Sequence, residues 1–118
     1  MKNKSGPVKN SSKRKLDNEV YERQVQICKA FANSTRLKIL DLVAERTQTS
    51  SSLQQQLGIS TPNLSQHLAI LKAAGVVLTR REGKQIYCSL AMPEVKQACQ
   101  LIRGVLRAQI RNGRKLAV

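Results

Sequence analysis

Residues 60–90, STPNLSQHLAILKAAGVVLTRREGKQIYCSL, decide the fold of this chain. Apolar side chains in the first half of this stretch recur at helical spacing: Leu64, Leu68, Ile70 and Leu71. This periodicity predicts a helix from Thr61 to Ala74 that buries one side against a core. The opposite side and the leading end of this helix, here called the reading helix, are polar.

The two ends of the reading helix carry recognisable boundary residues. Ser60 or Thr61 can accept hydrogen bonds from the first backbone N–H groups, and Pro62 fits the first turn. Gly75 follows the last helical residue and ends the helix, because glycine adopts a left-handed backbone readily. The polar side chains left on the outer face can contact a partner, and they are Thr61, Asn63, Ser65, Gln66 and His67.

Beyond Gly75 the apolar period shortens from helical spacing to two. This change predicts two strands, over residues 76–79 and 85–90, that form a β-hairpin. The tip between the strands is Arg80, Arg81, Glu82, Gly83 and Lys84. Positive charge around a glycine suits contact with a phosphate backbone, although an ordinary solvated turn has a similar composition. Because the hairpin follows the reading helix directly, we expect the basic tip and the polar side of this helix to form one docking surface.

The charge balance indicates a polyanionic partner. The 118 residues include 21 Lys and Arg against 7 Asp and Glu, which gives a net charge of +14 and an isoelectric point near 10.5. Nucleic acid is the simplest such partner. No stretch approaches the roughly 20 apolar residues of a transmembrane helix, and the start of the chain lacks the apolar segment of a secretory signal. We therefore expect a cytoplasmic protein with no membrane contact.

The composition divides the chain into one small domain with two tails. Residues 1–15 hold six Lys and Arg, no acidic residue and few apolar ones, which predicts a disordered basic tail. A solvated leader without function is the alternative. The folded domain is expected over residues 16–112, with a short C-terminal tail at 113–118. The six tail charges account for less than half of the net charge, so the nucleic-acid inference does not depend on them.

Four further helices are predicted, over residues 16–32, 35–44, 51–57 and 93–112. Gly58 ends the third of these, and two residues later the reading helix begins, which is a helix-turn-helix arrangement. The chain is thus expected to be mainly α with a small β-hairpin, a winged helix-turn-helix. The last helix has an apolar face broad enough for both its own core and a second subunit: Val95, Ala98, Cys99, Ile102, Val105, Leu106 and Ile110.

Four segments carry a specific resemblance: FANSTRLKIL (31–40), LGIS (57–60), NLSQHLAILKAAG (63–75) and RREGKQIY (80–87). They resemble the arsenic-repressor (ArsR/SmtB-type) family of bacterial winged helix-turn-helix transcriptional regulators. The SQHL segment followed by LKAAG is the strongest of these signals. The resemblance extends over about residues 20–110, nearly the whole expected domain.

The resemblance implies a homodimer, joined through the first and last helices, that represses transcription. Such a dimer binds a roughly palindromic stretch of double-stranded DNA and releases it on meeting an effector. Each protomer would place its reading helix in a major groove, with Ser65, Gln66 and His67 as the principal contacts. Gln and Asn can present a donor and an acceptor to an adenine edge. Arg80, Arg81 and Lys84 would hold the flanking backbone or the minor groove.

His67 is the only histidine of the chain. A single histidine without cysteine or carboxylate neighbours does not make a metal site, so a hydrogen bond to phosphate or base is the favoured role. Simple exposure to solvent is the alternative. The seven carboxylates are scattered and there is no phosphate-binding glycine loop, so neither enzymatic activity nor a cofactor is expected.

The three cysteines, Cys28, Cys88 and Cys99, form no CxxC pair and are expected to be reduced. Residues 47–53 hold no cysteine and the last helix holds no histidine, so the metal sites that the resemblance suggests are absent.

Cys28 and Cys99 lie on apolar helix faces, and the resemblance to dithiol sensors implies a site for reactive sulfur species or an oxidant. Those sensors carry their first cysteine inside the second helix, where this chain has Leu40 and Asp41. Arsenite bound by thiolates, with Cys88 recruited from the wing, and plain packing of small side chains are the alternatives.

A different class of function also stays open. The same fold can serve as a nonspecific nucleic-acid module or as a protein-interaction module. A reading helix with varied polar side chains beside a basic wing favours specific DNA recognition, whereas a uniformly basic or apolar helix would favour the rival. The ratio of specific to nonspecific affinity at physiological salt separates the two.

Overall fold

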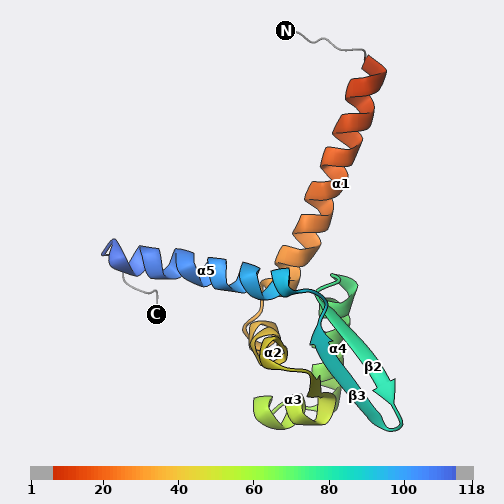
Figure 1. Ribbon diagram of the computed structural model, residues 1–118, viewed down its shortest axis with the longest axis vertical. Helices are drawn as coiled ribbons and strands as arrows, with labels where there is room; N and C mark the ends of the chain where they lie inside the picture. Colours follow the sequence, from red (N-terminus) through yellow and green to blue (C-terminus); the bar gives the residue numbers. More distant parts are fainter. Residues whose placement is uncertain (1–6, 114–118) are drawn as a thin grey trace.

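The computed structural model describes residues 7–113 of the chain (Figure 1). In chain order its elements are α1 (Pro7–Phe31), α2 (Ser34–Glu45), β1 (Gln48–Thr49), α3 (Ser50–Leu57), α4 (Thr61–Ala73), β2 (Val77–Glu82), β3 (Gln85–Leu90) and α5 (Pro93–Arg111). The order confirms the predicted winged helix-turn-helix, mainly α with a small β-hairpin. Helix α4 is the reading helix of the sequence analysis, and β2 with β3 is the wing.

Helix α1 begins earlier than predicted. Its first residue is Pro7, so residues 7–15 are helical where a disordered basic tail was expected. Proline is tolerated at the first helical position, where its missing N–H has no partner to lose, and the lysines and arginine that follow are good helix formers. The charge pattern alone therefore misled the prediction. The remaining tail residues, 1–6 and 114–118, lie outside the described residues.

Side-chain caps and a glycine fix the helix-turn-helix. The hydroxyl of Thr49 accepts a hydrogen bond from the Ser52 N–H at 3.1 Å, and the hydroxyl of Ser60 accepts one from the Asn63 N–H at 3.3 Å. Between the two helices Gly58 has a φ of 65°, and its N–H donates to the Gln54 carbonyl at 2.8 Å. The predicted stop at Gly58 and the predicted cap at Ser60 are confirmed.

A third strand, which the sequence analysis missed, completes the sheet in the order β1-β3-β2. Gln48 of β1 pairs with Cys88 of β3, and its side chain is buried. That amide donates to the Leu42 carbonyl at 3.1 Å and accepts from the Ser52 hydroxyl at 3.2 Å, which satisfies the buried polar atoms. A two-residue polar strand offers no apolar alternation, so the sequence around Gln48 gives no signal for a strand.

The hydrophobic core forms where α2 meets α4, the sheet and the first turns of α5. Its buried side chains are Ala30, Ile39, Leu40, Val43, Leu53, Leu64, Leu68, Leu71, Val76, Val77, Cys88, Val95 and Cys99. Ile70 departs from the prediction, because it is 38% exposed on the flank of α4. Three leucines, rather than four apolar residues, therefore anchor the reading helix.

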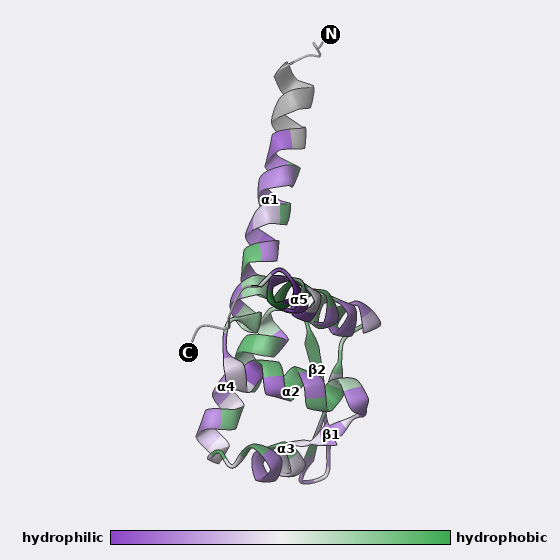
Figure 2. Cartoon of the chain, turned by 90° about the vertical axis from the view of Figure 1, so that its left-hand side faces the viewer, coloured by the Kyte–Doolittle hydropathy of each residue, from purple (hydrophilic) through white to green (hydrophobic). Residues whose placement is uncertain are grey.

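Helices α1 and α5 project from the core in different directions (Figure 1). Apolar residues are interspersed with polar ones along the projecting part of α1 (Figure 2). The exposed large apolar side chains of these two helices are Leu16, Val20, Tyr21, Val25, Ile27, Leu101, Ile102, Val105, Leu106 and Ile110. This many exposed large apolar side chains on two helices usually marks a contact with another molecule.

Replacing Gly58 by alanine should destabilise the domain, because a Cβ is strained at a φ of 65°. Gly58→Ala is expected to lower the free energy of unfolding by about 1 kcal/mol, measured by urea denaturation at one fixed protein concentration. Gly58→Asn is the matched control, since asparagine tolerates this backbone and should lose less. Equal losses in the two variants would contradict a backbone origin.

Candidate nucleic-acid interface

The first turns of α4 and the tip of the β2–β3 hairpin lie at one end of the molecule, and α1 and α5 leave from the other end (Figure 1). Leu64, Leu68 and Leu71 are buried and hold α4 against the core. The same helix therefore presents its polar side outward, and Thr61, Asn63, Ser65 and Gln66 are all exposed. All four of these predicted reading residues are therefore accessible to solvent on α4.

Thr61 at the start of this face has a protein partner. The Gln54 side-chain amide of α3 donates to the Thr61 hydroxyl oxygen at 2.9 Å. This bond spans the turn of the helix-turn-helix and ties the end of α3 to the start of α4. The Thr61 hydroxyl still has its own proton to donate, because a hydroxyl both donates and accepts.

His67 is less exposed than the other predicted reading residues and contacts Arg36 of α2. Its Nδ1 lies 3.3 Å from a terminal nitrogen of the Arg36 guanidinium. Partial burial and, after it, the Arg36 charge both lower the pKa of His67 below its ordinary value. The neutral imidazole therefore predominates at pH 7.

The three basic residues of the wing are all exposed, but they differ in their partners within the protein. The Arg80 guanidinium lies over the Tyr87 ring, 4.8 Å from its centroid, and its Nε donates to the Glu82 carboxylate at 2.9 Å. Arg81 points to the other face of the sheet, because side chains alternate along a strand. Both Arg81 and Lys84 are exposed.

The turn of the wing is also shorter than predicted. Strand β2 continues to Glu82, and only Gly83 and Lys84 lie between the strands. Arg80 is therefore a strand residue with two intramolecular partners, rather than part of the turn between the strands. Arg81 and Lys84 remain the better candidates for phosphate contacts.

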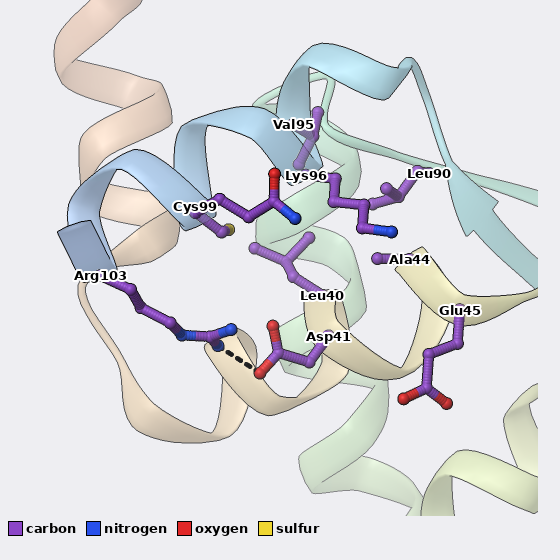
Figure 3. A pocket seen from close by; sticks show the side chains of 10 residues that line it. Leu40, Asp41, Ala44, Glu45, Leu90, Val95, Lys96, Cys99 and Arg103 are labelled. Atoms are coloured by element: carbon purple, nitrogen blue, oxygen red, sulfur yellow. Dashed lines mark hydrogen bonds and ion pairs between the residues drawn. The ribbon is translucent and has the colours of Figure 1, made fainter.

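A pocket of about 330 Å³ lies between α2 and α5 (Figure 3). Leu40, Val95 and Cys99 line its apolar part, and an ion pair between Asp41 and Arg103 crosses it. Cys99 is buried, and burial, followed by the Asp41 charge, raises the pKa of its thiol. The Cys99 thiol is therefore protonated at neutral pH and is a weaker nucleophile than an exposed thiol.

The other two predicted thiols lie in different surroundings. Cys28 is exposed on α1, and no disulfide joins the three cysteines of the described residues. Cys88 is completely buried in β3, and burial raises the pKa of its thiol. Across residues 7–113 no group of three or more His, Cys, Asp and Glu side chains could hold a metal ion.

Sequence reasoning missed Arg36 and Gln54, which hold two of the reading residues. Arg36 stands in the first turn of α2, where the helix dipole disfavours a positive charge. A positive charge at an unfavourable end of a helix indicates that Arg36 has partners in other elements. Gln54 offered no comparable signal, since a glutamine on an exposed helix face is ordinary.

An anchored helix with an open polar face, a glycine turn before it and a hairpin beside it define a winged helix-turn-helix domain. Within residues 7–113 no helix is long and apolar enough to cross a bilayer. Residues 33–79, which include the helix-turn-helix, match the family described as bacterial regulatory protein, arsR family.

Individual relatives agree with this match. The chain is 34% identical over 88 residues to the HTH-type transcriptional regulator Rv0081 of Mycobacterium tuberculosis, which covers 74% of this chain and 77% of that protein. The crystal structure of Rv0081 superimposes with a TM-score of 0.73 at 32% identity, over 79% of this chain and 94% of that chain.

The repressor SdpR of Bacillus subtilis is 42% identical over 64 residues, which span 54% of this chain and 71% of that protein. The homodimeric winged helix-turn-helix DNA-binding domain Mb0332 of Mycobacterium bovis gives a TM-score of 0.73 at 26% identity, over 86% of this chain and 94% of that chain. This chain belongs to the ArsR family of winged helix-turn-helix transcriptional regulators.

The partners of Arg80, Glu82 and Tyr87, lead to a prediction about DNA affinity. Arg81→Ala combined with Lys84→Ala should weaken binding to any duplex and reduce the dependence of affinity on salt by about one to two phosphate contacts. Fluorescence anisotropy over a salt series measures both. Arg80→Ala is the control and should change the salt dependence less, because Glu82 already neutralises Arg80. If the double variant keeps the same dependence of affinity on salt, the wing does not contact the phosphates.

Proposed function

We propose that this protein is a homodimeric repressor that recognises a palindromic DNA operator through α4 and is released by an effector. The observation that carries the proposal is the open polar face of α4, held rigidly by three buried leucines beside a basic wing. Such a regulator acts on DNA in the cytoplasm and needs no catalytic group. The likeness to the repressor SdpR supports the direction of regulation.

Base recognition is assigned to the exposed middle of the reading face. Ser65 and Gln66 lie one turn into α4, past the capped end, where a helix in the major groove approaches base edges. Gln66 and Asn63 can each present a donor and an acceptor to the N6 and N7 atoms of adenine, while Thr61 suits phosphate or mixed contacts. Arg81 and Lys84 hold the flanking backbone.

Dimerisation is assigned to the apolar surfaces of α1 and α5. Leu101 is 73% exposed and Val105 is 60% exposed, although both are large apolar residues on the same helix. A small domain with few aromatic residues has little core of its own, and a second copy would bury these side chains. The homodimeric state of Mb0332 supports this assignment.

The effector is proposed to act on thiols, through oxidation or persulfide chemistry at Cys28 and Cys99. The pocket beside Cys99 would admit a small reactant, and its position between α2 and α5 connects the proposed dimer helix to the core. The raised pKa of Cys99 makes the exposed Cys28 the faster thiol to react. Arsenite held by thiolates is the alternative effector.

The rival class is a winged-helix module that binds nucleic acid without sequence preference. A net charge of +14 would give tight binding to any polyanion at low salt. A preference for the operator over a scrambled duplex at physiological salt would support the repressor, and its absence would support the rival. A reporter gene behind the operator then distinguishes repression from activation.

Removing the base-reading side chains should lower specificity more than affinity for random DNA. Ser65→Ala and Gln66→Ala are each expected to reduce operator preference by about fivefold to a hundredfold, the value of a lost base contact. The measurement is competition between operator and scrambled duplexes at physiological salt. Gln97→Ala, a loss of an exposed amide on α5, is the control. Equal losses of affinity for the operator and the scrambled duplex would contradict the assignment of Ser65 and Gln66 as base-reading residues.

A charge placed on the apolar side of α5 should separate the dimer. Val105→Glu is expected to yield a monomer, because an unpaired carboxylate would be buried at the proposed interface. Light scattering after gel filtration measures the mass. Arg107→Glu, on the basic side of the same helix, changes the charge more and should leave the dimer intact. A dimer in both variants would refute the interface.

The thiol proposal predicts a reversible loss of operator binding on oxidation. Treatment with a polysulfide donor should release the reduced protein from the operator, and a reductant should restore binding. Cys28→Ser and Cys99→Ser should each prevent the release, whereas Cys88→Ser should not. Binding that is unchanged by treatment would leave the cysteines as packing residues and direct attention to arsenite.

A further inference from the structure

Arg36 of α2 connects its own helix to α1 and to α4, the reading helix. Its Nε donates to the Ala30 carbonyl at 2.7 Å, and one terminal nitrogen donates to the Lys29 carbonyl at 2.9 Å. The other terminal nitrogen reaches Nδ1 of His67 on α4 at 3.3 Å. One side chain of α2 thus binds the end of α1 and the middle of the reading helix.

The position of Arg36 in the first turn of α2 is explained by its hydrogen-bond partners, because its own helix does not favour a positive charge there. A positive charge in the first turn of α2 opposes the helix dipole, so Arg36 is disfavoured there by itself. The last carbonyls of α1 have no partner inside that helix and carry partial negative charge. The guanidinium donates to two of them, of which the Lys29 carbonyl also accepts from the Ala32 N–H. These two bonds fix the plane of the guanidinium and leave its remaining nitrogen facing His67.

The contact determines which nitrogen of His67 carries the proton. A guanidinium has only donors, so Nδ1 of the imidazole must be the acceptor. The neutral ring then holds its proton on Nε2. Protonation of Nδ1 would place two donors and two positive charges against each other. Around this ring α2 contributes the Arg36 charge, while α1 reaches the same guanidinium through the carbonyls of Lys29 and Ala30.

We propose that Arg36 is a positioning residue of the reading surface, which holds His67 as the neutral Nε2–H tautomer and so makes His67 a hydrogen-bond donor to DNA. The DNA part of this inference rests on the proposed function. The partner of His67 must then be an acceptor, either a phosphate oxygen or an acceptor on a base edge such as N7 or O6 of guanine. An imidazole with the opposite tautomer could not hold the Arg36 contact.

The single histidine makes the first test direct. Long-range proton–nitrogen NMR of the full chain at pH 7.5 contains the signals of one imidazole, and the two nitrogen shifts report the tautomer. We expect Nδ1 unprotonated and Nε2 protonated. Arg36→Met removes the donors but keeps the aliphatic chain, and it should mix the tautomers and raise the pKa of His67 toward its ordinary value. Arg36→Lys keeps a charged donor and should retain part of the preference.

Lys38→Met is the control for this measurement, because it removes the same charge from an exposed site on α2. Thermal denaturation of each variant shows that the fold is kept. A protonated Nδ1 in the natural protein, or a tautomer and pKa that Arg36→Met leaves unchanged, would overturn the proposal without any reference to DNA.

The second test asks whether Arg36 acts through His67. His67→Ala should weaken operator binding about fivefold, the value of one hydrogen bond. Arg36→Met should cost affinity in the natural protein but not in the His67→Ala background, whereas equal costs in both backgrounds would overturn the positioning role. Equal losses on operator and scrambled duplexes identify a phosphate as the acceptor, and a loss confined to the operator identifies a base.

The two proposals fail in different ways. If the natural protein binds operator and scrambled duplexes equally, the proposed repressor is wrong, and the NMR result still decides the role of Arg36.

Discussion

The burial of Leu64, Leu68 and Leu71 in the hydrophobic core is the constraint on which the rest of the structure depends. Each of these leucines contributes about 2–5 kcal/mol by the usual cost of truncation to alanine, so α4 has little freedom to rotate about its axis. Because helical side chains follow a fixed angular spacing, this anchoring forces the polar residues outward. Ser65 and Gln66 are therefore exposed because the leucines on the other side of α4 are buried in the core.

The polar side chains around this anchor fall into two groups. Gln54, Arg36 and Glu82 form hydrogen bonds inside the molecule, to Thr61, His67 and Arg80 respectively. Asn63, Ser65, Gln66, Arg81 and Lys84 remain exposed. Groups whose hydrogen bonds are already arranged lose less conformational freedom on binding, which favours the tight geometry that base recognition needs. The exposed group is available for the proposed contacts with DNA, and the hydrogen bonds of the other group hold Thr61, His67 and Arg80 in place.

Much of the fold could be predicted because its signals are local. Gly58, Ser60 and Gly75 mark the ends of their helices through backbone geometry and capping, and the change of apolar period marks the wing. The misses have equally local reasons. The strand at Gln48 is too short and polar to show alternation, and the helix over residues 7–15 was hidden by a composition that is also typical of disorder.

The sequence by itself determined the class of this protein, since periodicity, caps and the SQHL to LKAAG segment are properties of neighbouring residues. Only the tertiary structure decided which candidate residues are available to DNA. His67 and Arg36 are 31 positions apart, and Arg80 meets Tyr87 only because the strand register pairs them. Contacts of this kind depend on how separate elements pack, and no spacing along the chain encodes them.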